Sequence, residues 1–245
     1  KNLFEGLSPW MQKLPGGLIH VNVVGCALFA AISGSSAATV ATVGKMSIPE
    51  LRKRKYPEKI LLGSLAGSGT LGLLIPPSII LIIYGVTVQE SIAKLFIAGI
   101  LPGIMIAAIF MLYVVFWSLL NKKVMPKSLE NFSFFEKIKK SKQLLPVIIL
   151  ILAVIGSIYT GIATATEAAS LGVLGALILS YFQKSLNLKT FKESLLGATK
   201  TSCMIAFILA GSSFLSLAMG FTGLPRNLAI WIQNMDLSSY ILIFV

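Results

Sequence analysis

Two long stretches of this sequence contain no charged residue, and small polar residues or prolines interrupt both of them. Residues 18–44 and residues 61–89 hold no aspartate, glutamate, lysine or arginine. About 20 apolar residues are enough for a helix to cross the hydrocarbon core of a bilayer. Over the whole chain of 245 residues only 12% are charged, and the mean hydropathy is +0.86. A soluble domain of this length could not bury that much apolar surface, so the sequence predicts an all-α polytopic membrane protein.

The rare residue types exclude several classes of function. The chain has one histidine, His20, one aspartate, Asp236, and two cysteines, Cys26 and Cys203. Ligands for a metal cage cannot be collected at plausible spacings from so few residues. An intramembrane aspartyl protease needs two aspartates, and the sequence has no phosphate-binding loop of the GxxxxGK[ST] type. These observations argue against a metalloenzyme, an aspartyl protease and an ATPase motor on this chain.

The first charge-free stretch is broken at its centre by Ser33, Gly34, Ser35 and Ser36. The apolar arms on either side are about 22 Å and 18 Å long as helices, and neither crosses a core of about 30 Å. One long helix through the break is one interpretation. The other, which we favour, is a re-entrant hairpin over residues 18–48 with the polar turn at mid-membrane. Non-helical backbone at that depth is tolerated where it is buried in protein or faces a cavity.

The second charge-free stretch is predicted to form an interrupted helix over residues 60–84. Pro76 and Pro77 remove two backbone donors and force Ile75 out of the α region. Three glycines shortly before them weaken the preceding turns. The pattern therefore indicates a true interruption rather than a mild kink.

The rest of the chain divides by hydropathy into further segments. They are an amphipathic N-terminal arm at 1–17, a spanning helix at 95–120, a basic loop at 121–143, three apolar stretches within 144–224 and an interfacial segment leading into a new apolar element at 225–245. The first two of the three stretches are interpreted as short spans, and a second hairpin over 144–184 fits the pattern equally well. Glu167 follows Thr164 at the expected start of a helix, where capping is its default role.

The positive charge is concentrated in three predicted loops. Seventeen of the 21 lysines and arginines lie in residues 45–59, 121–143 and 184–200. With a hairpin at 18–48 these segments share one side of the membrane, which the positive-inside rule makes cytoplasmic. The net charge of +12 therefore indicates orientation and contact with membrane lipid, and it requires no nucleic-acid partner.

The two interruptions are the best candidates for a binding site. Broken helices free backbone carbonyl and amide groups near the bilayer centre, where carbonyls and hydroxyls suit Na⁺ and helix N-termini favour a carboxylate. The alternative is that glycine and serine only allow helices to pack closely. The combination of a polar turn with a double proline favours a functional role.

Several motifs resemble the large membrane subunit of the tripartite ATP-independent periplasmic (TRAP) transporters. The most specific are SGSSAATVATVG at 33–44 and GTLGLLIPPS at 69–78, and LPGGL at 14–18, the run at 84–103 and TATEAA at 164–169 support them. The resemblance implies a sodium-driven secondary importer of organic acids, such as C4-dicarboxylates or sialic acids, in the bacterial inner membrane. It also implies an elevator mechanism, a small four-helix membrane subunit and a periplasmic substrate-binding protein.

The resemblance also assigns roles to segments and residues of this sequence. It implies that 18–48 and 60–84 belong to the transport domain and that 144–224 forms scaffold spans of a second repeat. A second hairpin is implied to begin near Ser238. The chain would then be a fragment that carries half of the site. The implied sodium-binding residues are Ser33, Gly34, Ser35, Ser36, Gly69, Thr70 and Gly72. The implied substrate-binding residues are Ser35, Ser36, Pro76, Pro77 and Ser78.

Two other functions are weighed against the transporter. One is a channel or a purely structural membrane subunit, which would show ohmic current rather than saturable flux. The other is an intramembrane serine hydrolase that uses Ser35 or Ser36 with His20, which would require close hydrogen-bond geometry. The sequence has no GxSxG nucleophile elbow, so the hydrolase is a remote alternative and the chain is expected not to be an enzyme.

Overall fold

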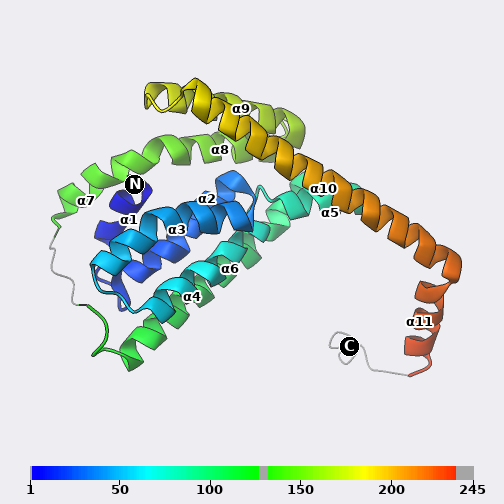
Figure 1. The fold of residues 1–245 in the computed structure, drawn as a ribbon, viewed down its shortest axis with the longest axis horizontal. Coiled ribbons are helices and arrows are strands. Elements are labelled where there is room, and N and C mark those ends of the chain that lie inside the picture. The colour runs from blue at the N-terminus through cyan, green and yellow to red at the C-terminus, as the bar shows by residue number, and fades with distance from the viewer. Residues whose placement is uncertain (1, 127–131, 236–245) are drawn as a thin grey trace. The chain divides into compact units, whose positions relative to one another are not determined.

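Every regular element in the described part of the chain, residues 2–126 and 132–235, is a helix in the computed structural model (Figure 1). The predicted all-α class is therefore confirmed for these residues. The chain divides into two compact units, Lys1–Leu179 and Ser180–Val245. Each unit is described separately below.

The first unit begins with a helical hairpin. Helix α1 (Asn2–Met11) and the 3-10 turn η1 (Gly17–Ile19) lead into α2 (His20–Ser33), and the chain then reverses into α3 (Ser36–Lys53). Only two residues separate α2 from α3, and the two helices pack against each other. The apolar arms on either side of the polar turn are therefore two antiparallel helices.

The second charge-free stretch contains three short elements. They are α4 (Glu58–Gly69), the 3-10 turn η2 (Thr70–Leu73) and α5 (Ile79–Val88). Residues 74–78, called the break below, lie between η2 and α5. The long helix α6 (Ile92–Leu120) follows, and its N-cap Ser91 accepts a hydrogen bond from the backbone N–H of Lys94.

The remaining helices are shorter or belong to the second unit. They are α7 (Phe134–Ser141), the turn η3 (Lys142–Leu144), α8 (Leu145–Tyr159) and α9 (Ala165–Phe182), and then α10 (Leu188–Thr222) and α11 (Leu224–Gln233). Among the described residues, three helices are long and apolar enough to cross a membrane: α6, α9 and α10. Several apolar helices of this kind are what a multi-pass membrane protein requires.

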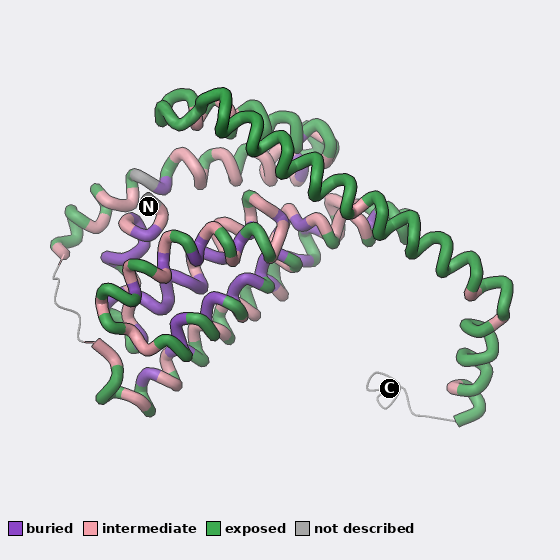
Figure 2. The backbone as a smooth tube through the Cα atoms, in the orientation of Figure 1, coloured by how far each residue is buried: buried purple, intermediate pink, exposed green. Residues whose placement is uncertain are grey.

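The core of the first unit lies where α2, α3 and α4 pack together. Figure 2 shows buried residues along these helices, and Ile19, Leu51 and Leu61 are completely buried there. Asn22 adds a polar link between α2 and α4, because its side-chain amide donates to the Leu61 carbonyl at 3.1 Å and to the Ser64 hydroxyl at 3.0 Å. These two bonds satisfy the NH2 group of the buried amide, whereas its Oδ1 oxygen has no hydrogen-bond partner within the described chain.

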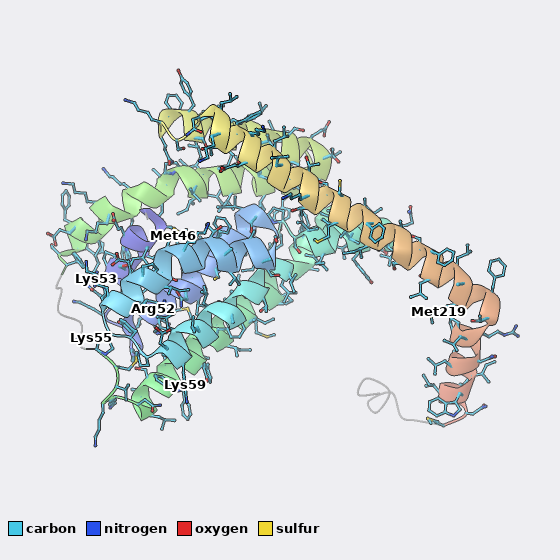
Figure 3. All side chains as sticks on the ribbon, viewed as in Figure 1. Met46, Arg52, Lys53, Lys55, Lys59 and Met219 are labelled. Atoms are coloured by element: carbon cyan, nitrogen blue, oxygen red, sulfur yellow. The ribbon has the colours of Figure 1, made fainter. Side chains whose placement is uncertain are left out.

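The connection between α3 and α4 carries a cluster of positive charge. Arg52 and Lys53 lie with Lys55 and Lys59 at the same end of the two helices (Figure 3). The Arg52 guanidinium donates to Glu58 Oε1 at 2.6 Å and lowers the pKa of that carboxyl. The pair is exposed, and such surface ion pairs contribute little to stability.

Two glycines let α6 approach the break closely. A Cβ atom on Gly99 would lie 2.9 Å from the backbone oxygen of Leu74, and one on Gly103 would lie 3.0 Å from the Ile75 side chain. The two glycines are four residues apart, so they share one face of α6. The break is therefore held against a helix surface that has no side chains at these points.

The structure differs from the sequence analysis in all three basic segments, which contain helix. Residues 45–53 belong to α3. Residues 188–200, which were treated as loop, form the first turns of α10, where Asn187 caps the helix by accepting from the Thr190 N–H at 2.7 Å. The segment 121–143 contains α7, which begins with a capping box between Ser133 and Glu136. Lysine is a good helix former, so a high lysine content did not imply a loop. The proposed start of a second hairpin near Ser238 lies outside the described residues.

We expect Gly99→Ala to destabilise the first unit by about 1–3 kcal/mol, because the added methyl group meets a backbone oxygen that cannot move freely. The measurement is the free energy of unfolding of the detergent-solubilised protein. Gly63→Ala is the matched control, since a Cβ there meets nothing within 4 Å and alanine is favoured over glycine in helices. Equal effects of the two substitutions would contradict the close packing of α6 on the break.

Candidate functional site

The hairpin tip, which comprises Ser33, Gly34, Ser35 and Ser36, reverses the chain between α2 and α3. Gly34 adopts a left-handed conformation with φ +58°, and its N–H donates to the Ala30 carbonyl at 2.9 Å. Ser35 is extended and caps α3 by accepting a hydrogen bond from the Ala38 N–H at 3.4 Å. A glycine at the end of one helix and a serine at the start of the next are the residues that these positions prefer.

A threonine that the sequence analysis did not select completes the polar network of the tip. The hydroxyl of Thr39 donates to the Ser35 carbonyl at 2.7 Å and lies 3.0 Å from the Ser33 hydroxyl. Thr39 is completely buried. The sequence contained a signal for this role, because Thr39 lies four residues after Ser35. A threonine in a helix can donate its hydroxyl to the backbone carbonyl four residues earlier.

The break has a polar connection to the hairpin tip. Ser78 is buried at the N-cap of α5, and its hydroxyl donates to the Leu73 carbonyl at 2.7 Å. The next residue, Ile79, donates its backbone N–H to the Gly34 carbonyl at 3.3 Å. One backbone hydrogen bond therefore links the start of α5 to the tip of the hairpin.

Two glycines bring the backbones of these segments into direct contact. A Cβ atom on Gly34 would lie 2.8 Å from the Pro77 oxygen, and one on Gly72 would lie 2.9 Å from the Ser35 carbon and the Ser36 nitrogen. No side chain fits between the segments at either point. The tip is thus seated against η2 on one side and against the break on the other.

This arrangement gathers helix ends of both polarities. Ser35 and Ser78 are the N-cap residues of α3 and α5, and α2 ends beside them at Ser33. Helix N-termini carry a partial positive charge and C-termini a partial negative charge. None of the residues 33–36 or 69–79 has a charged side chain. The local field therefore comes from backbone groups and hydroxyls.

The structure brings together most of the residues that the sequence selected, and their binding roles stay predictions. Gly69 is buried, and a Cβ on it would run into the Val40 side chain. Thr70 is different, because it is exposed and its hydroxyl donates to the Gly67 carbonyl at 2.7 Å. Ser68, which the sequence analysis missed, is completely buried, and its hydroxyl has no hydrogen-bond partner within the described chain.

Two further polar residues have structural explanations. His20 lies in the first turn of α2, one whole helix away from Ser35, and its Nε2 is 2.8 Å from the Pro15 carbonyl. About 20 Å of helix separates the two residues, so His20 cannot act as a base for a serine at the tip. Glu167 accepts from the backbone N–H and the hydroxyl of Thr164, both at 2.8 Å, which confirms its capping role.

An apolar cavity of about 340 Å³ lies beside the break. Ile32 and Pro77 line it on the side of the tip, and Val154 and Gly172 line it on the side of α8 and α9. The cavity has no charged lining residue, so it does not suit an anion. The polar backbone groups of the tip and the break are the better candidate site.

The comparison with protein-family models and the comparison with curated proteins point to the same family. The family model described as "Tripartite ATP-independent periplasmic transporter, DctM component" matches residues 3–245. The chain is 34% identical to the C4-dicarboxylate TRAP transporter large permease protein DctM of Pseudomonas aeruginosa, over 100% of this chain and 57% of that protein.

Two other relatives are named for different substrates. The isethionate TRAP transporter permease protein DctMQ of Oleidesulfovibrio alaskensis is 34% identical over 89% of this chain and 34% of its own length. The sialic acid TRAP transporter large permease protein SiaM of Vibrio cholerae is 31% identical over 94% of this chain and 53% of its own length. The chain thus spans from about a third to somewhat over half of these relatives.

We expect Gly72→Ala to push the hairpin tip away from η2, because the new methyl group would lie 2.9 Å from two backbone atoms of the tip. Hydrogen exchange of the amides in 33–39 should become faster, and the free energy of unfolding should fall by about 1–3 kcal/mol. Gly67→Ala is the control, since its nearest neighbour is the Phe110 ring at 3.4 Å. Unchanged exchange in Gly72→Ala would show that the tip is not held at this contact.

Proposed function

The chain belongs to the DctM-component family of tripartite ATP-independent periplasmic transporters, and on this premise we propose that it supplies half of the binding site of a sodium-coupled importer of small organic acids. Its relatives are named as transporter permeases, so the chain is not an enzyme. The observation that supports the proposal most directly is the meeting of helix ends of both polarities at the tip and the break, without any charged side chain.

Sodium is proposed to bind among the oxygen atoms of the tip and of residues 68–72. Carbonyl and hydroxyl oxygens are hard ligands that suit this ion, and unwound helix segments provide them at the membrane midplane. The buried hydroxyl of Ser68 lacks a partner, which fits a position that an ion or water would satisfy. Thr70 is the weakest of the candidates, because it is exposed, whereas Ser68 and Gly69 beside it are buried.

The organic acid is proposed to bind at the N-termini of α3 and α5, beside Ser35, Ser36, Pro76, Pro77 and Ser78. These helix ends present backbone N–H groups and a favourable dipole to a carboxylate. A sodium ion nearby would add positive charge beside the anion. Each ligand then raises the affinity for the other, because binding free energies are coupled reciprocally.

Transport is proposed to follow an elevator mechanism in the bacterial inner membrane. The hairpin and the interrupted helix are in direct backbone contact, which favours their movement as one body. The boundary with α8 and α9 contains the apolar cavity and so offers few polar contacts to break during sliding. A small four-helix membrane subunit and a periplasmic binding protein are proposed as the partners.

Uptake by the full-length permease with its partners in proteoliposomes tests the coupling. We expect saturable uptake of a C4-dicarboxylate or a sialic acid that depends on an inward sodium gradient. The reason is that the bound cation offsets the cost of placing a carboxylate in a site without charged side chains. Uptake that persists unchanged without the gradient would exclude sodium coupling, and ohmic current without saturation would indicate a channel.

The proposed site is tested in the same uptake assay by Ser35→Ala, which removes a hydroxyl of the tip, and by Pro76→Ala, which removes one of the two prolines that interrupt the helix. We expect a higher sodium concentration for half-maximal uptake, by about tenfold for a lost hydrogen bond or ligand worth about 1.4 kcal/mol. Ser185→Ala is the control, because Ser185 lies outside the tip and the break and its exposed hydroxyl donates only to a nearby backbone carbonyl. A normal sodium response in both site variants would place the ion elsewhere.

A further inference from the structure

Helix α7 has an unusual distribution of exposed side chains. Phe134 and Phe135 are 68% and 78% exposed, and Ile138 is also exposed. Such aromatic and aliphatic side chains are normally buried. They lie on an eight-residue helix that also carries Lys137, Lys139 and Lys140, so the helix is amphipathic and basic.

The only carboxylate of α7 is used inside the helix. Glu136 accepts a hydrogen bond from the Ser133 backbone N–H at 2.9 Å and forms a capping box with that residue. The three lysines of α7, together with Lys142 in η3, therefore give this segment a strong local excess of positive charge.

Helix α7 is attached to α1 through Trp10. The Trp10 indole N–H donates to the Ser141 hydroxyl at 2.8 Å, and its ring contacts Phe134 edge to face with centroids 6.2 Å apart. The Lys137 ammonium lies 5.3 Å from the centroid of the same ring. Trp10 is itself 41% exposed, so one continuous aromatic surface extends from α1 to α7.

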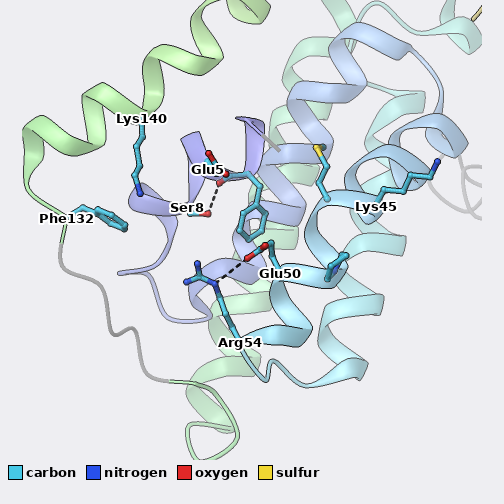
Figure 4. Close-up of a pocket in the computed structure, with 10 residues that line it drawn as sticks. Glu5, Ser8, Lys45, Glu50, Arg54, Phe132 and Lys140 are labelled. Atoms are coloured by element: carbon cyan, nitrogen blue, oxygen red, sulfur yellow. Dashed lines mark hydrogen bonds and ion pairs between the residues drawn. The ribbon is translucent and has the colours of Figure 1, made fainter. Parts of the chain in front are cut away.

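A cavity beside α7 is a second place where positive charge gathers, but its charge is mixed. About 400 Å³ in volume, it is lined by Lys45, Arg54 and Lys140 but also by Glu5 and Glu50 (Figure 4). Arg54 is 4.0 Å from Glu50. Both signs of charge are present there, so the cavity is not a purely positive site. Lys139 and Lys142 do not line it and are exposed, and they carry positive charge on the outer surface of α7 and η3.

The direction of α7 relative to the next helix suits a membrane surface. Helices α7 and α8 are bent by 57° at their junction, and α8 is strongly apolar. A helix that lies in the headgroup region and a helix that enters the hydrocarbon core are related by such a bend. Aromatic residues and lysines are enriched in the headgroup region, where lysines extend toward the water.

We propose that α7 and Trp10 form an interfacial anchor that binds the anionic phospholipid surface of the membrane. Phe134, Phe135 and Ile138 enter the boundary between headgroups and acyl chains, while Lys139 and Lys142 contact lipid phosphates. Because Trp10 joins α7 to α1, the anchor fixes the segment that leads into the hairpin. The inference is independent of the sodium and substrate sites.

A fluorescence titration tests this anchor in the full-length permease. An environment-sensitive fluorophore is attached to Phe135→Cys on a background without other cysteines, and phosphatidylglycerol or phosphatidylcholine is added to the detergent-solubilised protein. We expect a saturable blue shift with phosphatidylglycerol at a much lower lipid concentration than with phosphatidylcholine. One lysine near an anionic surface contributes about fivefold in affinity.

A charge variant and a matched control make the test specific. Lys139→Gln with Lys142→Gln should raise the half-saturating phosphatidylglycerol concentration about tenfold or more. Lys189→Gln with Lys192→Gln removes two exposed lysines from α10 and should leave it unchanged. Equal responses to both lipids, or equal effects of both double variants, would overturn the proposal.

Discussion

The close backbone contact between the hairpin tip and the interrupted helix is the constraint on which the rest of the first unit depends. Gly34 and Gly72 leave no room for a Cβ atom at this contact, and Gly99 leaves none where α6 meets the break. The three glycines come from the hairpin, from η2 and from α6. The chain leaves regular helix at the tip and at the break, so these two segments depend on each other and on the continuous surface of α6 to cover and satisfy their backbone groups.

A site without charged side chains has a physical advantage inside a membrane. A permanent ion in an apolar environment is costly unless it is paired, whereas hydroxyls and backbone groups can satisfy one another when no ligand is bound. Thr39, Ser33 and Ser35 do so at the tip, and Ser78 does so with Leu73. A neutral framework of this kind leaves no charged side chain of the protein buried without a partner when the site is empty.

The sequence predicted those features that depend on local chemistry. Gly34, Ser35 and the two prolines interrupt helices through their own backbone preferences, and the structure breaks at these residues. Features that depend on contacts between distant segments were not predictable in this way. Gly99 resembles any other helix glycine until its neighbour Leu74 is known, and Thr70 fitted the site by sequence although its hydroxyl bonds to Gly67. The first turns of α10 were missed because lysines were interpreted as a sign of loop.

The hydrogen bond from the Ile79 N–H to the Gly34 carbonyl has a consequence for how such a chain can diversify. It joins two segments through backbone atoms, so of the possible substitutions only a proline at position 79, which lacks the N–H, would delete it directly. Residues around it can change the shape and polarity of the site while the joint itself persists. A library aimed at the proposed site would therefore keep positions 34, 72 and 99 as glycine and vary Ser36 and its neighbours, so that the surroundings of the tip change while the contact between the tip and the break is kept.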